Sequence, residues 1–108
     1  MVQFRKILTQ LSNRHGQKKS PYFLVEGVRC CEEALRNCDG LVEAVILADS
    51  FDVAGFQARL GNRSKVLSAA DIVSEREFNA LAVTENPQGI MTILHKPEGK
   101  DLPDHLPA

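Results

Sequence analysis

The sequence has no run of apolar residues that approaches the roughly 20 needed to span a membrane as a helix. Its first 25 residues also lack the apolar core and the small-residue cleavage site of a signal peptide. We therefore expect no membrane partner and a cytoplasmic location. With 108 residues and 44% hydrophobic side chains, the chain is expected to fold as one ordinary globular domain.

Cysteine is scarce and does not form the pattern of a disulfide framework. The three cysteines, Cys30, Cys31 and Cys38, are odd in number and lie within nine residues of one another. We interpret them as buried or half-buried thiols of a reducing compartment. A redox or metal-binding role is the alternative, although no histidine lies at a ligand spacing from them.

The chemistry of a complete enzyme is missing as well. The sequence contains no dinucleotide-binding glycine motif, no phosphate-binding Gly-Lys-Ser/Thr loop and no Gly-x-Ser-x-Gly nucleophile elbow. The three histidines, His15, His95 and His105, are far apart in the sequence. We therefore predict no catalytic and no metal-binding residue, and interpret the chain as a binding module rather than an enzyme in its own right.

The formal net charge of -1 conceals a strongly uneven distribution of charge. Residues 1–25 hold five cations and no acid, for +5, whereas the remainder holds eight cations and fourteen acids, for -6. Such asymmetry indicates an anionic partner, with nucleic acid first and a membrane surface second. The alternative is a solvated basic end without a partner. The five cations are Arg5, Lys6, Arg14, Lys18 and Lys19.

Apolar residues alternate between strand-like runs and helical spacing. Phe4 to Leu11 fits an amphipathic helix that Gly16 would stop, followed by a polar loop from Gln17 to Pro21. Ser-x-x-acid spacings at Ser68 and Ser74 predict a turn of helix and a fuller helix. The predicted strands are Tyr22–Val25, Val42–Ala48, Lys65–Leu67 and Ile90–Leu94, with further helices from Val28, from Val53 (capped by Ser50 or Asp52) and from Glu75.

This alternation of strands and helices predicts an α/β fold with a mostly parallel four-stranded sheet covered on both faces. Residues 97–108, with three prolines among charged residues, resemble a linker or a frayed tail.

Two short segments suggest a site at the ends of strands. Glu26 follows an apolar strand directly before Gly27, so its carboxylate is expected to accept hydrogen bonds from the first amides of the next helix. Direct contact with a ligand is the alternative. Gln88 offers a donor and an acceptor, and Gly89 lets a partner approach the backbone. A simple turn before the last strand explains the second segment equally well.

These residues resemble two signatures of a known family. Phe23-Leu24-Val25-Glu26-Gly27, with Arg29 and Glu33 after it and the basic stretch 14–19 before it, resembles the N-terminal substrate-binding domain of SpoU/TrmH-type RNA 2'-O-ribose methyltransferases. Thr84-Glu85-Asn86-Pro87-Gln88-Gly89-Ile90 is similar to the second signature of that domain. The resemblance covers residues 3 to about 96.

The resemblance implies a three-layer α/β/α sandwich with a mixed sheet, akin to kink-turn-binding ribosomal proteins. It also implies that residues 1–96 are an RNA substrate-binding domain and that 97–108 lead to a missing C-terminal catalytic domain. In the family that second domain binds S-adenosylmethionine and methylates a ribose 2'-hydroxyl of ribosomal or transfer RNA. This part is then expected to be monomeric, within a homodimeric parent enzyme.

The resemblance also suggests which residues contact RNA. Arg14, Lys18 and Lys19 match its basic stretch and would contact phosphates, and Arg29 matches a polar position at the start of the next helix. With no Trp and a single Tyr, recognition of RNA shape and backbone is favoured over base stacking. A protein-interaction or regulatory module with a basic N-terminal arm is the alternative. Three further candidates, Asn86, Gln88 and Gly89, are expected to lie near RNA. Glu26, Gly27 and Pro87 are expected to be structural residues of the two signatures. Arg5 and Lys6 are added as RNA contacts from their charge alone.

Overall fold

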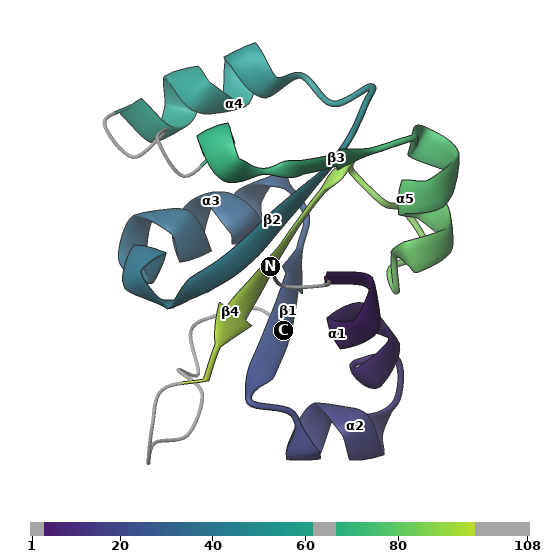
Figure 1. Ribbon diagram of the computed structural model, residues 1–108. Helices are drawn as coiled ribbons and strands as arrows, with labels where there is room; N and C mark the ends of the chain where they lie inside the picture. The colour runs from purple at the N-terminus through teal and green to yellow at the C-terminus, as the bar shows by residue number, and fades with distance from the viewer. Residues whose placement is uncertain (1–3, 62–66, 97–108) are drawn as a thin grey trace.

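The computed structural model describes residues 4–61 and 67–96 (Figure 1). No helix in these ranges exceeds the ten residues of α3, so none of them is long enough to cross a membrane. In chain order the elements are α1 (Phe4–Gln10), α2 (Arg14–Lys19), β1 (Tyr22–Glu26), α3 (Val28–Asn37), the 3-10 helix η1 (Asp39–Leu41), β2 (Val42–Ala48), α4 (Val53–Leu60), β3 (Asp71–Val73), α5 (Glu75–Leu81) and β4 (Ile90–His95).

The four strands form one sheet in the order β1-β4-β2-β3. Strand β4 is antiparallel to both of its neighbours, and only β2 and β3 run parallel. The predicted α/β fold with a mixed sheet is therefore confirmed, but the prediction of a mostly parallel sheet is wrong. The physical reason is that the connection through α5 returns the chain to the end of the sheet where β2 and β3 finish. Ile90 at the start of β4 pairs with Leu47 near the end of β2, so β4 runs back in the opposite direction.

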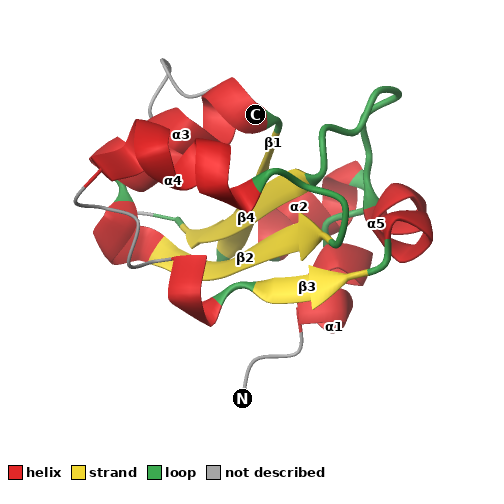
Figure 2. Ribbon diagram, turned by 90° about the horizontal axis from the view of Figure 1, so that it is seen from above, coloured by secondary structure: helices red, strands yellow, loops and turns green. Residues whose placement is uncertain are grey.

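Side chains alternate along the strands and build one apolar core on each face of the sheet. Val45 and Leu47 of β2 belong to the core under α3 and α4, which includes Leu35 and Phe56. Ile46, between them, belongs to the other core with side chains of α1 and α5. Figure 2 shows α3 and α4 on one side of the sheet and α1 and α5 on the other. The likeness to kink-turn-binding proteins stays a prediction.

The N-terminal segment forms two helices where we expected one helix and a loop. Helix α1 ends at Gln10, and α2 includes Gly16 and the whole stretch from Gln17 to Lys19. Asn13 starts the second helix, because its side chain accepts a hydrogen bond of 2.7 Å from the Gly16 amide. Gly16 is therefore not a helix stop, and the predicted polar loop is wrong.

The third strand lies several residues later than predicted. Lys65 and Val66 fall outside the described residues, and Leu67 belongs to a short 3-10 turn. The turn of helix predicted after Ser68 is a single 3-10 turn over Leu67–Ala69, and Asp71–Val73 forms β3. Ile72 is 63% exposed on this edge strand, so β3 lacks the apolar pattern of a buried strand.

Two predicted helix caps are confirmed. The Ser74 hydroxyl accepts a hydrogen bond of 3.0 Å from the Glu77 amide at the start of α5. The Asp52 carboxylate accepts one of 3.1 Å from the Gly55 amide at the start of α4. These side chains satisfy amides that have no partner within the helix. Of the two caps that the sequence allowed for α4, Ser50 and Asp52, the structure has Asp52.

Gly16 allows α2 to pack closely against the end of α1. A β-carbon at this position would lie 1.8 Å from the carbonyl oxygen of Gln10. We predict that Gly16→Ala lowers the free energy of unfolding by about 1–3 kcal/mol, because backbone atoms must move apart. Gly40→Ala is the control, because nothing lies within 4 Å of its β-carbon. Urea denaturation of both variants measures the difference, and equal stabilities would contradict the prediction.

Candidate nucleic-acid interface

Helix α2 is held in place by contacts with Lys96 after β4 and with Leu11 after α1. The Lys96 ammonium, just after β4, donates hydrogen bonds to the carbonyls of Gln17 at 2.6 Å and Lys18 at 3.5 Å. The Gln17 side-chain amide donates to the Leu11 carbonyl at 2.9 Å. A cation is favourable near the C-terminal end of a helix, where carbonyl groups lack partners. The short helix is therefore fixed in position although none of its residues is buried.

The three cations of α2 are available for an anionic partner. Arg14, Lys18 and Lys19 are all exposed. Within residues 4–61 and 67–96 no acidic side chain forms an ion pair with any of them. Their charges are therefore not neutralised by the described part of the protein itself, and the surface of α2 is positive.

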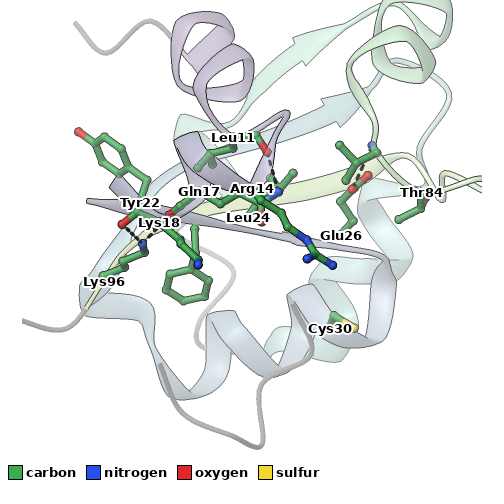
Figure 3. Close-up of a pocket in the computed structure, with 12 residues that line it drawn as sticks. Leu11, Arg14, Gln17, Lys18, Tyr22, Leu24, Glu26, Cys30, Thr84 and Lys96 are labelled. Atoms are coloured by element: carbon green, nitrogen blue, oxygen red, sulfur yellow. Dashed lines mark hydrogen bonds between the residues drawn. The ribbon is translucent and has the colours of Figure 1, made fainter. Parts of the chain in front are cut away.

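A cleft of about 660 Å³ opens beside α2 (Figure 3). Its volume lies within the range of small-molecule sites, about 300–1,000 Å³. Arg14 and Lys18 contribute charged side chains from α2, and Arg14 extends into the cleft toward the end that holds Glu26 and Cys30. The cleft is walled by apolar side chains as well as polar ones. Its other lining residues are Leu11, Gln17, Tyr22, Phe23, Leu24, Val83, Thr84 and Lys96.

Glu26 lies in this cleft and accepts hydrogen bonds from a segment that sequence reasoning did not identify. Its Oε2 accepts from the Val83 amide at 3.2 Å, and the Thr84 amide also bonds to the carboxylate. Burial raises the pKa of Glu26, and the two amide hydrogen bonds oppose that shift. Its Oε1 is buried and has no hydrogen-bond partner among the described residues. The expectation that Glu26 accepts from the first amides of the next helix is therefore wrong.

The first amide of α3 bonds instead to Gln88. The Val28 amide donates to Gln88 Oε1 at 2.7 Å, although the two residues are 60 positions apart. Gly27 before it has φ 98°, and a β-carbon there would lie 3.3 Å from the same oxygen. Gly27 is thus required by backbone conformation and by a close approach. The two sequence signatures meet in space at this hydrogen bond.

The rest of the second signature packs against the loop after β2. Gly89 has φ 87°, and its carbonyl accepts a hydrogen bond of 2.9 Å from the Ala48 amide. A β-carbon on Gly89 would lie 3.2 Å from the Phe51 ring. Pro87, Gln88 and Gly89 line a second hollow of about 340 Å³, which also includes residues missed by sequence reasoning: Ser50, Asp52, Glu75 and Asn79.

The remaining candidates are not gathered around α2. Arg5 forms a two-pronged ion pair with Glu77 of α5, with N–O distances of 2.6 and 3.0 Å. This pairing raises the pKa of Arg5 and lowers that of Glu77. Lys6 is exposed on α1, Arg29 is exposed in the first turn of α3, and Asn86 is exposed in the loop before β4. Arg5 is therefore already engaged within the protein.

The cysteines behave as structural thiols. Cys31 is buried, and its Sγ donates to the Val25 carbonyl at 3.4 Å. Burial raises its pKa to about 12, so the reactive thiolate is disfavoured. Cys30 and Cys38 are partly buried, and no disulfide joins any of the three, all of which lie within the described ranges. The interpretation of buried or half-buried thiols is confirmed.

Comparison with known proteins agrees with this architecture. Residues 5–92 match the family model of the MRM3-like substrate binding domain. The chain is 30% identical over 91 residues to the 23S rRNA (guanosine(2553)-2'-O)-methyltransferase RlmP of Bacillus subtilis, a match covering 84% of this chain and 34% of that protein. The chain therefore spans about a third of the length of this relative.

Solved structures share the fold. A TrmH-family RNA methyltransferase from Porphyromonas gingivalis matches with TM-score 0.61 and 18% identity over 94% of this chain and 38% of its own. An RNA 2'-O ribose methyltransferase matches with TM-score 0.59 and 25% identity over 97% of this chain and 38% of its own. Fold and matches together define an α/β substrate-binding domain of the SpoU/TrmH type. The chain belongs to the MRM3-like substrate binding domain family.

Gln88 caps α3 from a distance, so its loss should destabilise the fold. We predict that Gln88→Ala lowers the free energy of unfolding by about 0.5–2 kcal/mol, the usual cost of removing a helix N-cap. Gln57→Ala on the exposed face of α4 is the matched control. Chemical denaturation compares the two variants, and hydrogen exchange at the Val28 amide localises the effect. An unchanged Val28 exchange rate would show that the cap contributes nothing.

The raised pKa of Glu26 makes stability depend on pH. Above pH 4.5, the ordinary pKa of a glutamate, the folded protein still holds a proton on the Glu26 carboxyl group, whereas the unfolded chain has released it. Stability should therefore fall as pH rises from 4.5 through the folded-state pKa. We predict that Glu26→Gln removes this part of the pH dependence, and that Glu85→Gln in the exposed loop does not. Thermal unfolding across this pH interval tests it, and parallel profiles for wild type and Glu26→Gln would refute it.

Proposed function

We propose that this chain binds the RNA substrate of a 2'-O-ribose methyltransferase through the surface of α2 and the cleft beside it. The observation that carries the proposal is the set of three cations on α2 that have no acidic partner among the described residues. Contacts from Lys96 and Gln17 hold that helix in place, so the charges are presented in a fixed arrangement. Phosphate contacts of this kind position a nucleic acid on a protein surface.

Methyl transfer in this proposal belongs to another domain of a longer enzyme, joined through residues 97–108. The chain covers 34% of its Bacillus subtilis relative, which leaves room for such a domain there. The glycine turns of the two signatures leave no room for S-adenosylmethionine, because the Gln88 side chain lies against Gly27 and the Phe51 ring lies against Gly89. The cofactor would therefore be bound elsewhere in the enzyme, in the cytoplasm. The substrate would be ribosomal or transfer RNA, and the parent enzyme a homodimer whose RNA-binding part is monomeric.

The role of α2 predicts a specific response to charge reversal. Lys18→Glu should weaken binding of RNA hairpins, whereas Arg76→Glu makes the same charge change on α5 and should leave affinity nearly unchanged. If the three cations of α2 each neutralise one phosphate of a single-stranded segment, log affinity should fall with log salt with a slope of about -2. Fluorescence anisotropy at several salt concentrations measures both quantities.

Nuclear magnetic resonance distinguishes this function from that of a protein-interaction module. Adding RNA hairpins should shift the amide resonances of residues 14–19 and of the cleft. The proposal fails if RNA shifts no resonance, or if Lys18→Glu and Arg76→Glu bind RNA equally well. The first result would favour an acidic protein surface as the partner of α2, and the second would show that RNA binds without using Lys18.

A further inference from the structure

The cleft runs along the free edge of the sheet. Strand β1 is at the end of the strand order, and among the described residues it pairs only with β4. The Gly27 amide donates to the Ile90 carbonyl, and the Lys96 amide donates to the Pro21 carbonyl. In this register the odd-numbered residues from Pro21 to Gly27 direct their backbone hydrogen bonds toward β4. The even-numbered residues between them turn their backbone groups outward. Leu24 therefore presents an N–H donor and a C=O acceptor side by side in the wall of the cleft.

Glu26 adds an acceptor that lacks a donor. Its Oε2 is used by the loop after α5, but Oε1 is buried and unpartnered among the described residues. A buried acceptor without a hydrogen bond is costly, so a ligand that supplies a donor gains free energy at this position. Oε1 is covered from water, and the side chains around it must shift when such a ligand enters.

The other walls of the cleft suit a flat aromatic ring attached to an anionic chain. Leu24 and Val83 supply apolar surface, and the Arg14 guanidinium extends into the cleft, where it can stack on a ring. Lys18 lies at the same cleft and can contact a phosphate. An apolar slot with a polar edge and a flanking cation is the environment in which proteins hold unstacked bases of single-stranded RNA.

We propose that this cleft receives one unpaired nucleobase that carries an exocyclic amino group, which donates to Glu26 Oε1 while the base edge bonds to the backbone of Leu24. The inference rests on the proposed function and adds a base preference to it. Adenine, cytosine and guanine have such an amino group, and uracil does not. Recognition is therefore expected to exclude uracil at one position of the RNA.

An added peptide strand fits the same edge less well. The Tyr22 amide, one of the outward groups, already donates to the Ser20 hydroxyl at 3.1 Å, which shortens the edge open to pairing. The cations of α2 beside the cleft favour an anionic chain. An extended acidic peptide that binds the cleft in preference to RNA would overturn the inference.

The test uses the whole chain and a set of hairpin RNAs that share one stem and one uridine loop. A single loop position carries adenosine, cytidine, guanosine, uridine or purine riboside, which is adenosine without its amino group. Wild-type protein should bind the three amino-bearing loops about tenfold more tightly than uridine or purine riboside, since a hydrogen bond to a charged group is worth that much or more. Equal affinity for adenosine and purine riboside at every loop position would overturn the inference.

The variant Glu26→Gln provides a second and more specific test of the base preference. The Val83 amide requires an oxygen at the position of Oε2, so the glutamine must place its NH₂ group where Oε1 was. An acceptor becomes a donor, and the preference should invert toward uridine, which offers a carbonyl. Glu85→Gln is the control and should keep the wild-type preference. The amide resonances of Val83 and Thr84 confirm that the side chain keeps this orientation.

The outcomes separate the two proposals. If no hairpin binds, the proposed function fails, and this inference fails with it. If all hairpins bind alike, Lys18→Glu weakens them equally and Glu26→Gln changes nothing, the proposed function stands and only the base-binding inference fails. Inversion of the preference by Glu26→Gln alone supports both.

Discussion

The hydrogen bond from the Val28 amide to Gln88 Oε1 joins the N-terminal and C-terminal parts of this domain. It ties the start of α3, which follows β1, to the segment that leads into β4. That segment must cross from α5 to the middle of the sheet, and the bond holds it at the ends of the strands.

This bond also determines what Glu26 can do. An acidic residue directly before a helix would ordinarily satisfy the first amides of that helix. Gln88 occupies that role, so the Glu26 carboxylate turns to the amides of Val83 and Thr84 after α5. One carboxylate oxygen is then left beside the cleft without a partner. The two signatures are therefore one structural unit, and the position of the unpaired oxygen is a consequence of it.

Sequence reasoning succeeded where the signal is local and failed where it depends on distant partners. The caps at Asp52 and Ser74 and the apolar runs of β1, β2 and β4 can be recognised from neighbouring residues, because capping and burial are short-range patterns. Gly16 was misread as a helix stop, because its role depends on the Gln10 carbonyl that packs against it.

The partners of the candidate site were likewise beyond local reasoning. Gln88 accepts a hydrogen bond from the Val28 amide, and Glu26 accepts one from the Val83 amide. In both pairs the two residues are more than fifty positions apart in the sequence. The antiparallel direction of β4 was missed for the same reason, since strand order is a property of long connections. The cations of α2 can be identified from the charge distribution and the family resemblance, but their position beside a cleft required the fold.

Ion pairing explains how a chain with net charge -1 can present a cationic surface. Arg5 pairs with Glu77, and Arg36 and Arg59 share the single carboxylate of Glu32, so each of these cations has an acidic neighbour. Those of α2 form no such ion pair among the described residues. The acidic excess of residues 26–108 repels a polyanion from the rest of the surface, and the potential then favours approach at α2. The negative charge of the body thus contributes to orientation, because it makes the cationic surface of α2 beside the cleft a favourable place for a polyanion to approach.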